Sequence, residues 1–201
     1  MSNLSKHLKT VRTHRKFVRK MCWKMGLFWQ GLTHDLSKYS PTELGICKYY
    51  TGTKSPHEVC RDTRGYSPSW MHHYHKNKHH WHYWLDIEDW PSKVAAAKMP
   101  YKYVIEAFCD MVGASKAYAR NDPNWTEAAV WDYWVRKCKG KRLMHRTSEY
   151  LLEKLLWNYK EYGEKSFISS YKYLKKYLIS AYKDDSLLKE KDELFSYNLI
   201  G

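Results

Sequence analysis

Six histidines fall within the fourteen residues of the segment MHHYHKNKHHWHYW, residues 71–84. Neutral imidazole is a common ligand of divalent transition metals, so this density of histidine first suggests a metal site. On a continuous helix, His72 and His79 lie within about 20° of each other, as do His73 and His80. One broad helix face then presents all four rings, but a single face usually supplies only two ligands to one ion. Other segments must therefore provide the remaining ligands.

A solvated surface is the alternative interpretation of this segment. Lys76 and Lys78 lie among the histidines, which indicates that part of the helix faces water. The choice between the two interpretations depends on whether suitable partners occur elsewhere in the chain.

The dipeptide His34-Asp35, in the sequence THDLSK, is the first such partner. Adjacent His and Asp side chains at the end of a helix can both turn toward one ion, and the carboxylate can bridge two ions. Lys38 follows one helical turn later and is suited to hold a substrate anion as a point charge. His-Asp pairs also occur by chance in caps and on surfaces, so this pair gains weight only from its context.

Asp110 is the second partner, because it lies within the apolar sequence FCDMV. Burying an unpaired carboxylate is costly, so a counter-charge or a metal ion is expected beside it. Glu106 precedes Asp110 by one turn on nearly the same helix face and is suited to orient a ligand histidine. The alternative is that Asp110 faces solvent between two apolar stripes.

Taken in order, these residues resemble the HD superfamily of metal-dependent phosphohydrolases. The superfamily pattern runs H, then HD, often followed by lysine as in HDxGK, then further histidines in two-metal members, and finally D. A closer resemblance, over about residues 4–157, is to an uncharacterised family of small bacterial and phage proteins with a domain-of-unknown-function label. It rests on HDLSKYSPTEL, on the W-x-HH-x3-N-x-HH arrangement from Trp70 to His80, and on KMPYKYVIEAFCD.

The HD resemblance implies a role for each matching residue. The implied metal ligands are His14, His34, Asp35 and Asp110, with His72 or His73 and His79 or His80 completing a second metal position. Asp35 and Lys38 would act on the substrate, while Glu43, Asn77 and Glu106 would orient the ligands. Ser37 stands where HDxGK has glycine, and the GYP element of cyclic-dinucleotide phosphodiesterases is absent, which argues against that subgroup. His75 and His82 have no counterpart in the pattern and are treated as accessory.

The implied ligand set suits one or two divalent ions of Mn, Fe, Zn, Ni or Co. The first hypothesis is hydrolysis of a nucleotide or another small phosphoester. Asp35 would bridge two ions that activate water, and Lys38 would offset charge on the phosphoryl group. The second is an HD-type di-iron oxygenase, since inositol oxygenase and a phosphonate-cleaving relative share the scaffold, and the former carries a similar HDLGK. The third is a non-enzymatic basic protein that binds nucleic acid or a host protein and keeps a structural metal.

The overall composition narrows the classes of protein. The net charge of +14 over 201 residues favours an anionic substrate or a polyanion such as nucleic acid. Five cysteines without a C-x-x-C pair indicate reduced thiols, and the N-terminal residues lack the apolar run of a signal peptide or membrane span. We therefore expect a cytoplasmic protein without a membrane segment. An aromatic content of 16% excludes a disordered chain.

Helices must position these residues, because no segment shows the alternation of apolar and polar residues that is typical of a β-strand. We predict an all-α fold, with an HD-like metal-binding bundle over residues 1–146 and an amphipathic helical extension over residues 147–201. Helical spacing predicts a helix from Leu4 to Met25, and serine-proline pairs predict helix starts at Pro41 and Pro68. The second of these helices would carry the whole of residues 71–84. Asp122 and Pro123 predict a helix through about Arg136, whereas residues 51–66 and 87–100 are predicted to be irregular.

Overall fold

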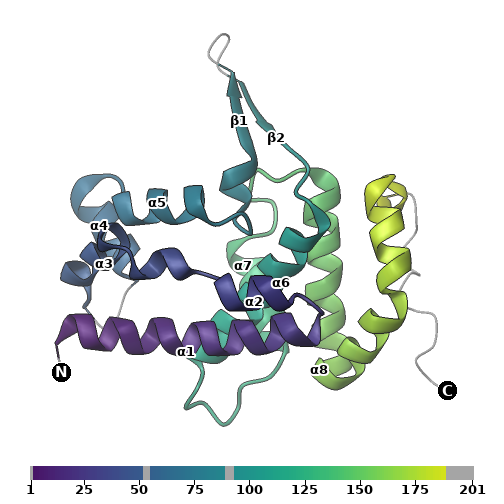
Figure 1. The fold of residues 1–201 in the computed structure, drawn as a ribbon, viewed down its shortest axis with the longest axis horizontal. Coiled ribbons are helices and arrows are strands. Elements are labelled where there is room, and N and C mark those ends of the chain that lie inside the picture. Colours follow the sequence, from purple (N-terminus) through teal and green to yellow (C-terminus); the bar gives the residue numbers. More distant parts are fainter. Residues whose placement is uncertain (1, 52–54, 89–92, 189–201) are drawn as a thin grey trace.

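The computed structural model describes residues 2–51, 55–88 and 93–188, and Figure 1 shows that helices dominate them. The prediction of an all-α fold is confirmed, apart from one small hairpin. The long helix α1 (Asn3–Lys24) runs along one edge, and the short helix α2 (Phe28–Thr33) folds back beside it. α1 also packs against α6 (Tyr101–Tyr118), so the two ends of the predicted ligand set are close together.

α1 and α6 approach each other closely at Gly113. A Cβ atom placed on Gly113 would lie 2.4 Å from Val18 Cγ2 and 2.8 Å from the Val18 backbone nitrogen. Only a residue without a side chain permits this contact. His14 lies one turn before Val18 on α1, and Asp110 lies almost one turn before Gly113 on α6. The helix crossing therefore brings these two side chains together.

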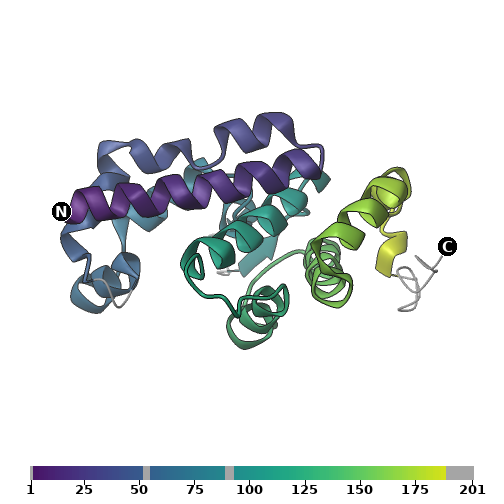
Figure 2. The ribbon, with the colours of Figure 1, turned by 90° about the horizontal axis from the view of Figure 1, so that it is seen from below.

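The apolar core is built mainly from α1, α6, α7 (Ala128–Lys137) and α8 (Arg146–Lys183). Its largest fully buried side chains include Phe108, Trp134, Leu151, Leu155, Tyr159, Phe167 and Tyr171. α8 begins beside the predicted boundary at residue 146, and its residues share this core with α6. Gly163 (φ 69°, ψ 165°) interrupts α8, and in Figure 1 the chain reverses direction at this kink, so that the two arms are antiparallel. Figure 2 shows the second arm at the far end of the molecule from the N-terminus.

The region around the histidine-rich segment differs from the sequence predictions. Ser40 and Pro41 begin a short helix as predicted, α3 (Pro41–Leu44), which a 3-10 helix continues (Gly45–Tyr49). By contrast, α4 (Pro56–Arg64) forms where an irregular segment was predicted. α5 (Pro68–Lys76) ends eight residues before Trp84, so the prediction that residues 71–84 form one helix was wrong. A 3-10 helix, Trp81–Trp84, follows the break.

Two further predictions were wrong. Within residues 87–100, predicted to be irregular, lies most of an antiparallel hairpin of β1 (Leu85–Glu88) and β2 (Lys93–Ala96), which projects from the body in Figure 1. Asp122 does not begin a helix. Its Oδ1 instead accepts a hydrogen bond from the backbone nitrogen of Asn124 at 2.9 Å, a local turn that competes with helix, and α7 starts at Ala128.

Across the described ranges, no helix combines the length and apolar character that crossing a membrane requires. The arrangement of α1, α2, α5 and α6 brings most of the predicted ligand residues together.

Candidate metal centre

Asp35 occupies the turn between α2 and a 3-10 helix, Leu36–Tyr39, with a left-handed backbone (φ 55°, ψ 28°). Few residues other than glycine adopt this conformation, but Asp and Asn tolerate it. The side chain is fully buried, and Lys38 Nζ lies 2.7 Å from its Oδ2. No described residue donates a hydrogen bond to Oδ1. A buried carboxylate oxygen without a donor is a place where a cation is favoured.

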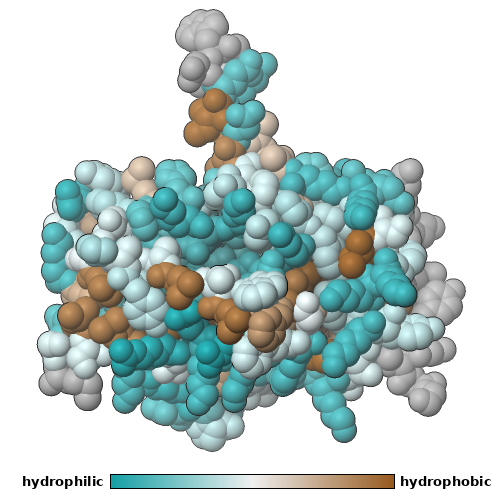
Figure 3. All heavy atoms as spheres, in the orientation of Figure 1, coloured by the Kyte–Doolittle hydropathy of each residue, from teal (hydrophilic) through white to brown (hydrophobic). Residues whose placement is uncertain are grey.

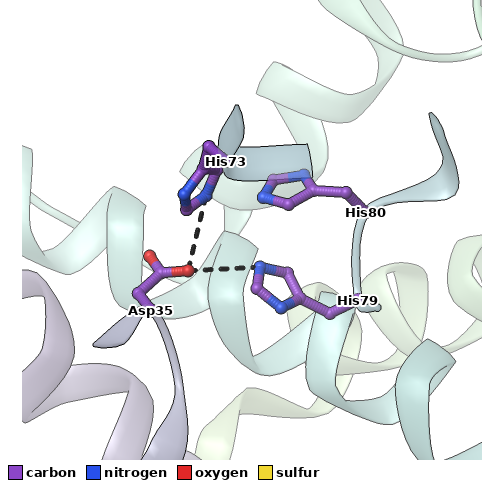
Figure 4. A group of neighbouring side chains, drawn as sticks. All are labelled: Asp35, His73, His79 and His80. Carbon is purple, nitrogen blue, oxygen red and sulfur yellow. Dashed lines mark ion pairs between the residues drawn. The ribbon is translucent and has the colours of Figure 1, made fainter. Parts of the chain in front are cut away.

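The first donor set surrounds Asp35 Oδ1. His73 Nε2 lies 3.4 Å from this oxygen, and His79 Nε2 lies 3.6 Å from it. His80 completes the set. Its Nε2, like that of His79, is buried and has no hydrogen-bond partner among the residues that the structure describes. Figure 4 shows the three rings and the carboxylate gathered around a common space.

The second donor set surrounds Asp35 Oδ2. His14 Nε2 lies 3.3 Å from this oxygen, and His34 Nε2 lies 3.4 Å from it. Asp110 Oδ1 closes the set at 3.0 Å from His14 Nε2 and 3.3 Å from His34 Nε2. These donors come from α1, from the residue after α2 and from α6, so only the folded chain assembles them.

The spacing of the donor atoms fits one ion for each set. Two ligands held about 2.1 Å from an ion lie about 3.0 Å apart at a right angle and about 3.4 Å apart at a tetrahedral angle. The separations of 3.0–3.6 Å are close to this range, and all donors of a set lie within 4.8 Å of one another. Asp35 belongs to both sets with a different oxygen in each, which is the arrangement of a carboxylate that bridges two ions.

Glu106 contacts one histidine ring of each donor set at Nδ1, the ring nitrogen that is not directed at the other donors. Its Oε1 accepts a hydrogen bond from His34 Nδ1 at 3.0 Å and lies 3.2 Å from His79 Nδ1. Each of these rings therefore carries a proton on Nδ1 and turns Nε2 toward the donors. The same three residues lie close enough to hold an ion themselves, but the two N–H groups already satisfy the oxygen. Glu106 thus has the orienting position that was predicted for it.

Glu43 and Asn77 support His73 in the same way. Glu43 Oε2 accepts a hydrogen bond from His73 Nδ1 at 2.8 Å, and its Oε1 accepts one from His72 Nδ1 at 2.8 Å. Asn77 donates from its amide nitrogen to the His73 carbonyl and to Ser37 Oγ, both at 2.7 Å. Ser37, the departure from the HDxGK pattern, therefore connects the turn that carries Asp35 to the end of α5.

The structure brings together seven of the eight predicted ligands, in the two donor sets: His14, His34, Asp35, His73, His79, His80 and Asp110. His72 is the exception, because its ring faces Glu43 outside both sets. The helical argument that paired His72 with His79 was wrong, since the backbone of Asn77 is extended (φ −116°, ψ 107°) and ends α5. After this break the chain turns, and both His79 and His80 enter the first donor set.

The carboxyl groups of the centre are held ionised. Burial raises the pKa of Asp35, but the charges of His34 and Lys38 outweigh burial and lower that pKa well below its usual value. Burial also raises the pKa of Asp110, and hydrogen bonds from His14 and His34 again lower it well below its usual value. Both carboxylates are therefore available as anionic ligands near neutral pH.

The histidines of the two sets respond differently to this environment. Burial lowers the pKa of His34, but Asp35 and Asp110 raise it well above its usual value. The excess carboxylate charge thus favours a second proton on His34, and a divalent ion at Nε2 would replace that proton. Burial and the neighbouring His79 lower the pKa of His80 well below its usual value, so its neutral ring is suited to ligation.

A cavity of about 800 Å³ opens onto the donors from the side of α6 and α7. His79, His80 and Asp110 form part of its wall. About half of its other lining residues are aromatic or charged, among them Trp70, Trp81, Tyr118, Asp122, Trp125, Asp132, Tyr133, Arg136 and Arg142. The lining residues from Tyr118 to Arg142 were not predicted as part of a site. They follow no motif, and the packing of α7 beside α6 brings them to the cavity.

Arg142 contributes a cation to that wall. Its guanidinium donates to Cys138 Sγ at 2.8 Å and lies over the Trp134 ring at 5.4 Å from the centroid. Among the described residues no carboxylate pairs with it. His82, accessory in the sequence pattern, lines the same cavity, and its pKa is lowered to about 4 by burial and then by Arg142. The cavity therefore contains a fixed positive charge apart from the metal donors.

Comparison with known proteins identifies one relationship. No curated protein and no solved structure matches the chain. A family model described as a family of unknown function (DUF5662) matches residues 3–158, which contain both donor sets and the cavity wall through Arg142. This match agrees with the predicted resemblance to an uncharacterised family, while kinship with the HD superfamily stays a prediction. The chain belongs to this family of unknown function.

Proposed function

We propose that this protein is a metal-dependent phosphohydrolase of the HD type with a dinuclear His/Asp centre. One observation carries the proposal: Asp35 directs one carboxylate oxygen to each of two donor sets. The order of the donors along the chain also follows the HD pattern. When bound, a pair of divalent ions supplies an activated water and stabilises the charge that develops during phosphoryl transfer.

The protein's own residues would hold and orient the reactants. Glu106 and Glu43 fix the ligand rings, so the centre is ordered before substrate arrives. Lys38 lies beside Asp35, and a quarter of its side chain is exposed, so it can contact a phosphoryl oxygen at the edge of the centre. Asp110, also partly exposed, faces the cavity from which substrate would enter.

The cavity supports a small phosphoester, such as a nucleotide, as the substrate. Its volume of about 800 Å³ exceeds what a phosphate ion needs and lies within the usual range of about 300–1,000 Å³ for small-molecule pockets. Arg142 offers charge for a second anionic group, and Trp125 and Tyr118 offer ring faces for a flat base. The substrate would then place its phosphoryl group at the donors and its organic group against the aromatic wall.

Asp35→Asn is the variant that tests the proposal. Asn has nearly the same shape and tolerates the left-handed backbone, so the fold should survive the loss of charge. We expect the wild-type protein to bind two Mn²⁺ or Zn²⁺ ions per chain by elemental analysis and to hydrolyse bis-p-nitrophenyl phosphate or p-nitrophenyl phosphate. The variant should lose both ions and at least 100-fold in kcat/KM. Unchanged metal content in Asp35→Asn would contradict the shared carboxylate.

Two neighbouring histidines provide a matched comparison. His72 and His73 both donate to Glu43, but only His73 directs Nε2 toward Asp35. We expect His73→Ala to lower the metal content and His72→Ala to retain it. Equal losses in the two variants would show that Glu43, and not direct ligation, accounts for the effect.

The oxygenase hypothesis makes a different prediction. Purification of the protein with iron and a visible absorption band would favour it over hydrolysis.

A further inference from the structure

A cationic stripe runs along the exposed side of α1. Arg12, Lys16 and Arg19 lie within about 60° of one another around the helix, and Trp23 continues the stripe one turn later. The helix contains no acidic residue, and among the described residues these three cations have no ion-pair partner. From Arg12 to Trp23 the stripe extends about 16 Å at 1.5 Å per residue. Such uncompensated charge favours an extended anionic partner.

Three exposed aromatic rings lie at one end of this stripe. Trp23 is 45% exposed, Phe28 is 55% exposed and Trp29 is 71% exposed. Trp23 and Phe28 stack at 5.6 Å between centroids with an interplanar angle of 15°, and Phe28 meets Trp29 edge-on at 5.5 Å. The guanidinium of Arg19 lies over the Trp23 ring at 5.5 Å. We name Trp23, Phe28 and Trp29 the aromatic triad.

The backbone holds the triad in place. Gly31 on α2 packs against Trp23, since a Cβ atom at Gly31 would lie 3.0 Å from Trp23 Nε1 and 3.1 Å from Cys22 Cβ. Trp23 is thus fixed between α1 and α2, and the exposed rings need little reordering to bind. Figure 3 shows this face of the molecule, where hydrophobic atoms over α2 border a hydrophilic band over α1.

We propose that α1 and the aromatic triad bind single-stranded nucleic acid. A strand presents phosphates along its backbone and flat bases beside them, which matches a row of cations that leads to exposed rings. Bases would stack on the triad, and phosphates would contact Arg12, Lys16 and Arg19. The surface lies on α1 and α2 outside the donor sets, so this inference does not depend on the proposed hydrolysis.

Fluorescence anisotropy with a labelled 20-nucleotide oligothymidylate tests the proposal on the full-length protein. We expect saturable binding that weakens at least 5-fold in Trp29→Ala, because stacking of one base contributes about 1–3 kcal/mol. In the double variant Arg12→Ala/Lys16→Ala, the slope of log K against log salt should fall by about 1.4, at about 0.7 for each lost phosphate contact. Circular dichroism melts establish that both surface variants remain folded.

The second arm of α8 provides the matched controls, because it also carries exposed basic and aromatic residues. Tyr173 is 86% exposed, and Lys172 and Lys176 are exposed beside it. Tyr173→Ala and Lys172→Ala/Lys176→Ala should leave the oligonucleotide affinity within 2-fold. The proposal is overturned if these variants weaken binding as much as those on α1, or if the wild-type protein does not bind. Trp29-dependent binding to phosphatidylserine vesicles without oligonucleotide binding would also overturn it and identify a membrane surface.

Discussion

At the scale of single residues, the left-handed backbone of Asp35 allows one carboxylate to serve both donor sets. The turn points the side chain into the space between α1, α5 and α6, where its two oxygens face different histidines. Glu106 has a comparable double role, because one of its oxygens meets a ring from each set. Substituting a residue that contacts both donor sets should therefore lower the metal affinity more than substituting a ligand of one set.

Glu106→Gln tests this expectation. The amide keeps the shape of the side chain but replaces the charged acceptor, so the rings of His34 and His79 lose the partner that fixes their Nδ1 protons. We expect the affinity for Zn²⁺, measured by competition with a chromophoric chelator, to fall about 10–100-fold. Glu161→Gln, on the surface of α8, is the control and should leave the affinity unchanged. An unchanged affinity in Glu106→Gln would show that packing alone orients the rings.

Much of the centre could be predicted from residue types, because chemistry limits what a buried Asp or a cluster of His can do. His34, Asp35 and Asp110 stand out in sequence for this reason, and the structure brings them together. The choice between His72 and His73 could not be predicted. It depends on which face of α5 turns toward Asp35, and the packing of α5 against α3 and the 3-10 helix Leu36–Tyr39 sets that face.

At the scale of elements, the crossing of α1 and α6 sets the distance between His14 and Asp110. Gly113 permits the crossing, because any side chain there would meet the backbone of Val18. The sequence marks Gly113 only as a glycine within a helical pattern, where it is usually unfavourable. The close approach that explains it is a property of two helices and could not be predicted from either one.

Gly113→Ala should therefore weaken both the fold and the centre. The added Cβ would lie 2.4 Å from Val18 Cγ2, so the helices must separate, at a cost of about 1–3 kcal/mol in the free energy of unfolding. The 3.0 Å contact between His14 and Asp110 would lengthen, and metal affinity should fall as well. Denaturant melts and chelator competition measure the two effects. Gly45→Ala is the control, since nothing lies within 4 Å of its added Cβ; equal stability of the two variants would contradict the close crossing.

At the scale of the whole molecule, Glu164 connects three helices. It follows the Gly163 kink of α8 and forms ion pairs with Lys24 of α1 and Lys116 of α6, and Tyr159 donates to it at 3.0 Å. Burial raises the pKa of Glu164, but the hydrogen bonds from Lys116 and Lys24 outweigh it and lower that pKa to about 2. The kink thus places one carboxylate where it can hold the second half of the chain to the first.

The pH dependence of stability follows from that pKa. Because the pKa of Glu164 is lower in the folded state than in the unfolded one, its contribution is complete above about pH 4.5 and is lost as the pH falls toward 2. We expect Glu164→Gln to unfold about 1–3 kcal/mol more easily at pH 7, and the difference from wild type to shrink below pH 4. Urea melts at pH 7, 4 and 2.5 measure this. A difference that stays constant with pH would contradict the ionised Glu164.

The helical class could be predicted over most of the chain because apolar spacing is a long-range pattern, whereas the hairpin could not. β1 and β2 have four residues each and project from the body, so their strands carry almost no burial pattern. The kink in α8 could not be predicted from the sequence either. The Leu- and Tyr-rich pattern after Arg146 indicates helix on both sides of Gly163, but the direction of the second arm depends on its packing.

Because both donor sets contain Asp35, their occupancies would be thermodynamically linked. An ion at Oδ1 would draw electron density from the carboxylate and fix its orientation, which changes the affinity at Oδ2 by some factor. Reciprocity requires that an ion at Oδ2 change the affinity at Oδ1 by the same factor. The protein would then respond to the metal concentration as one coupled unit and not as two independent sites, so its binding isotherm would reveal the cooperativity that a shared ligand imposes.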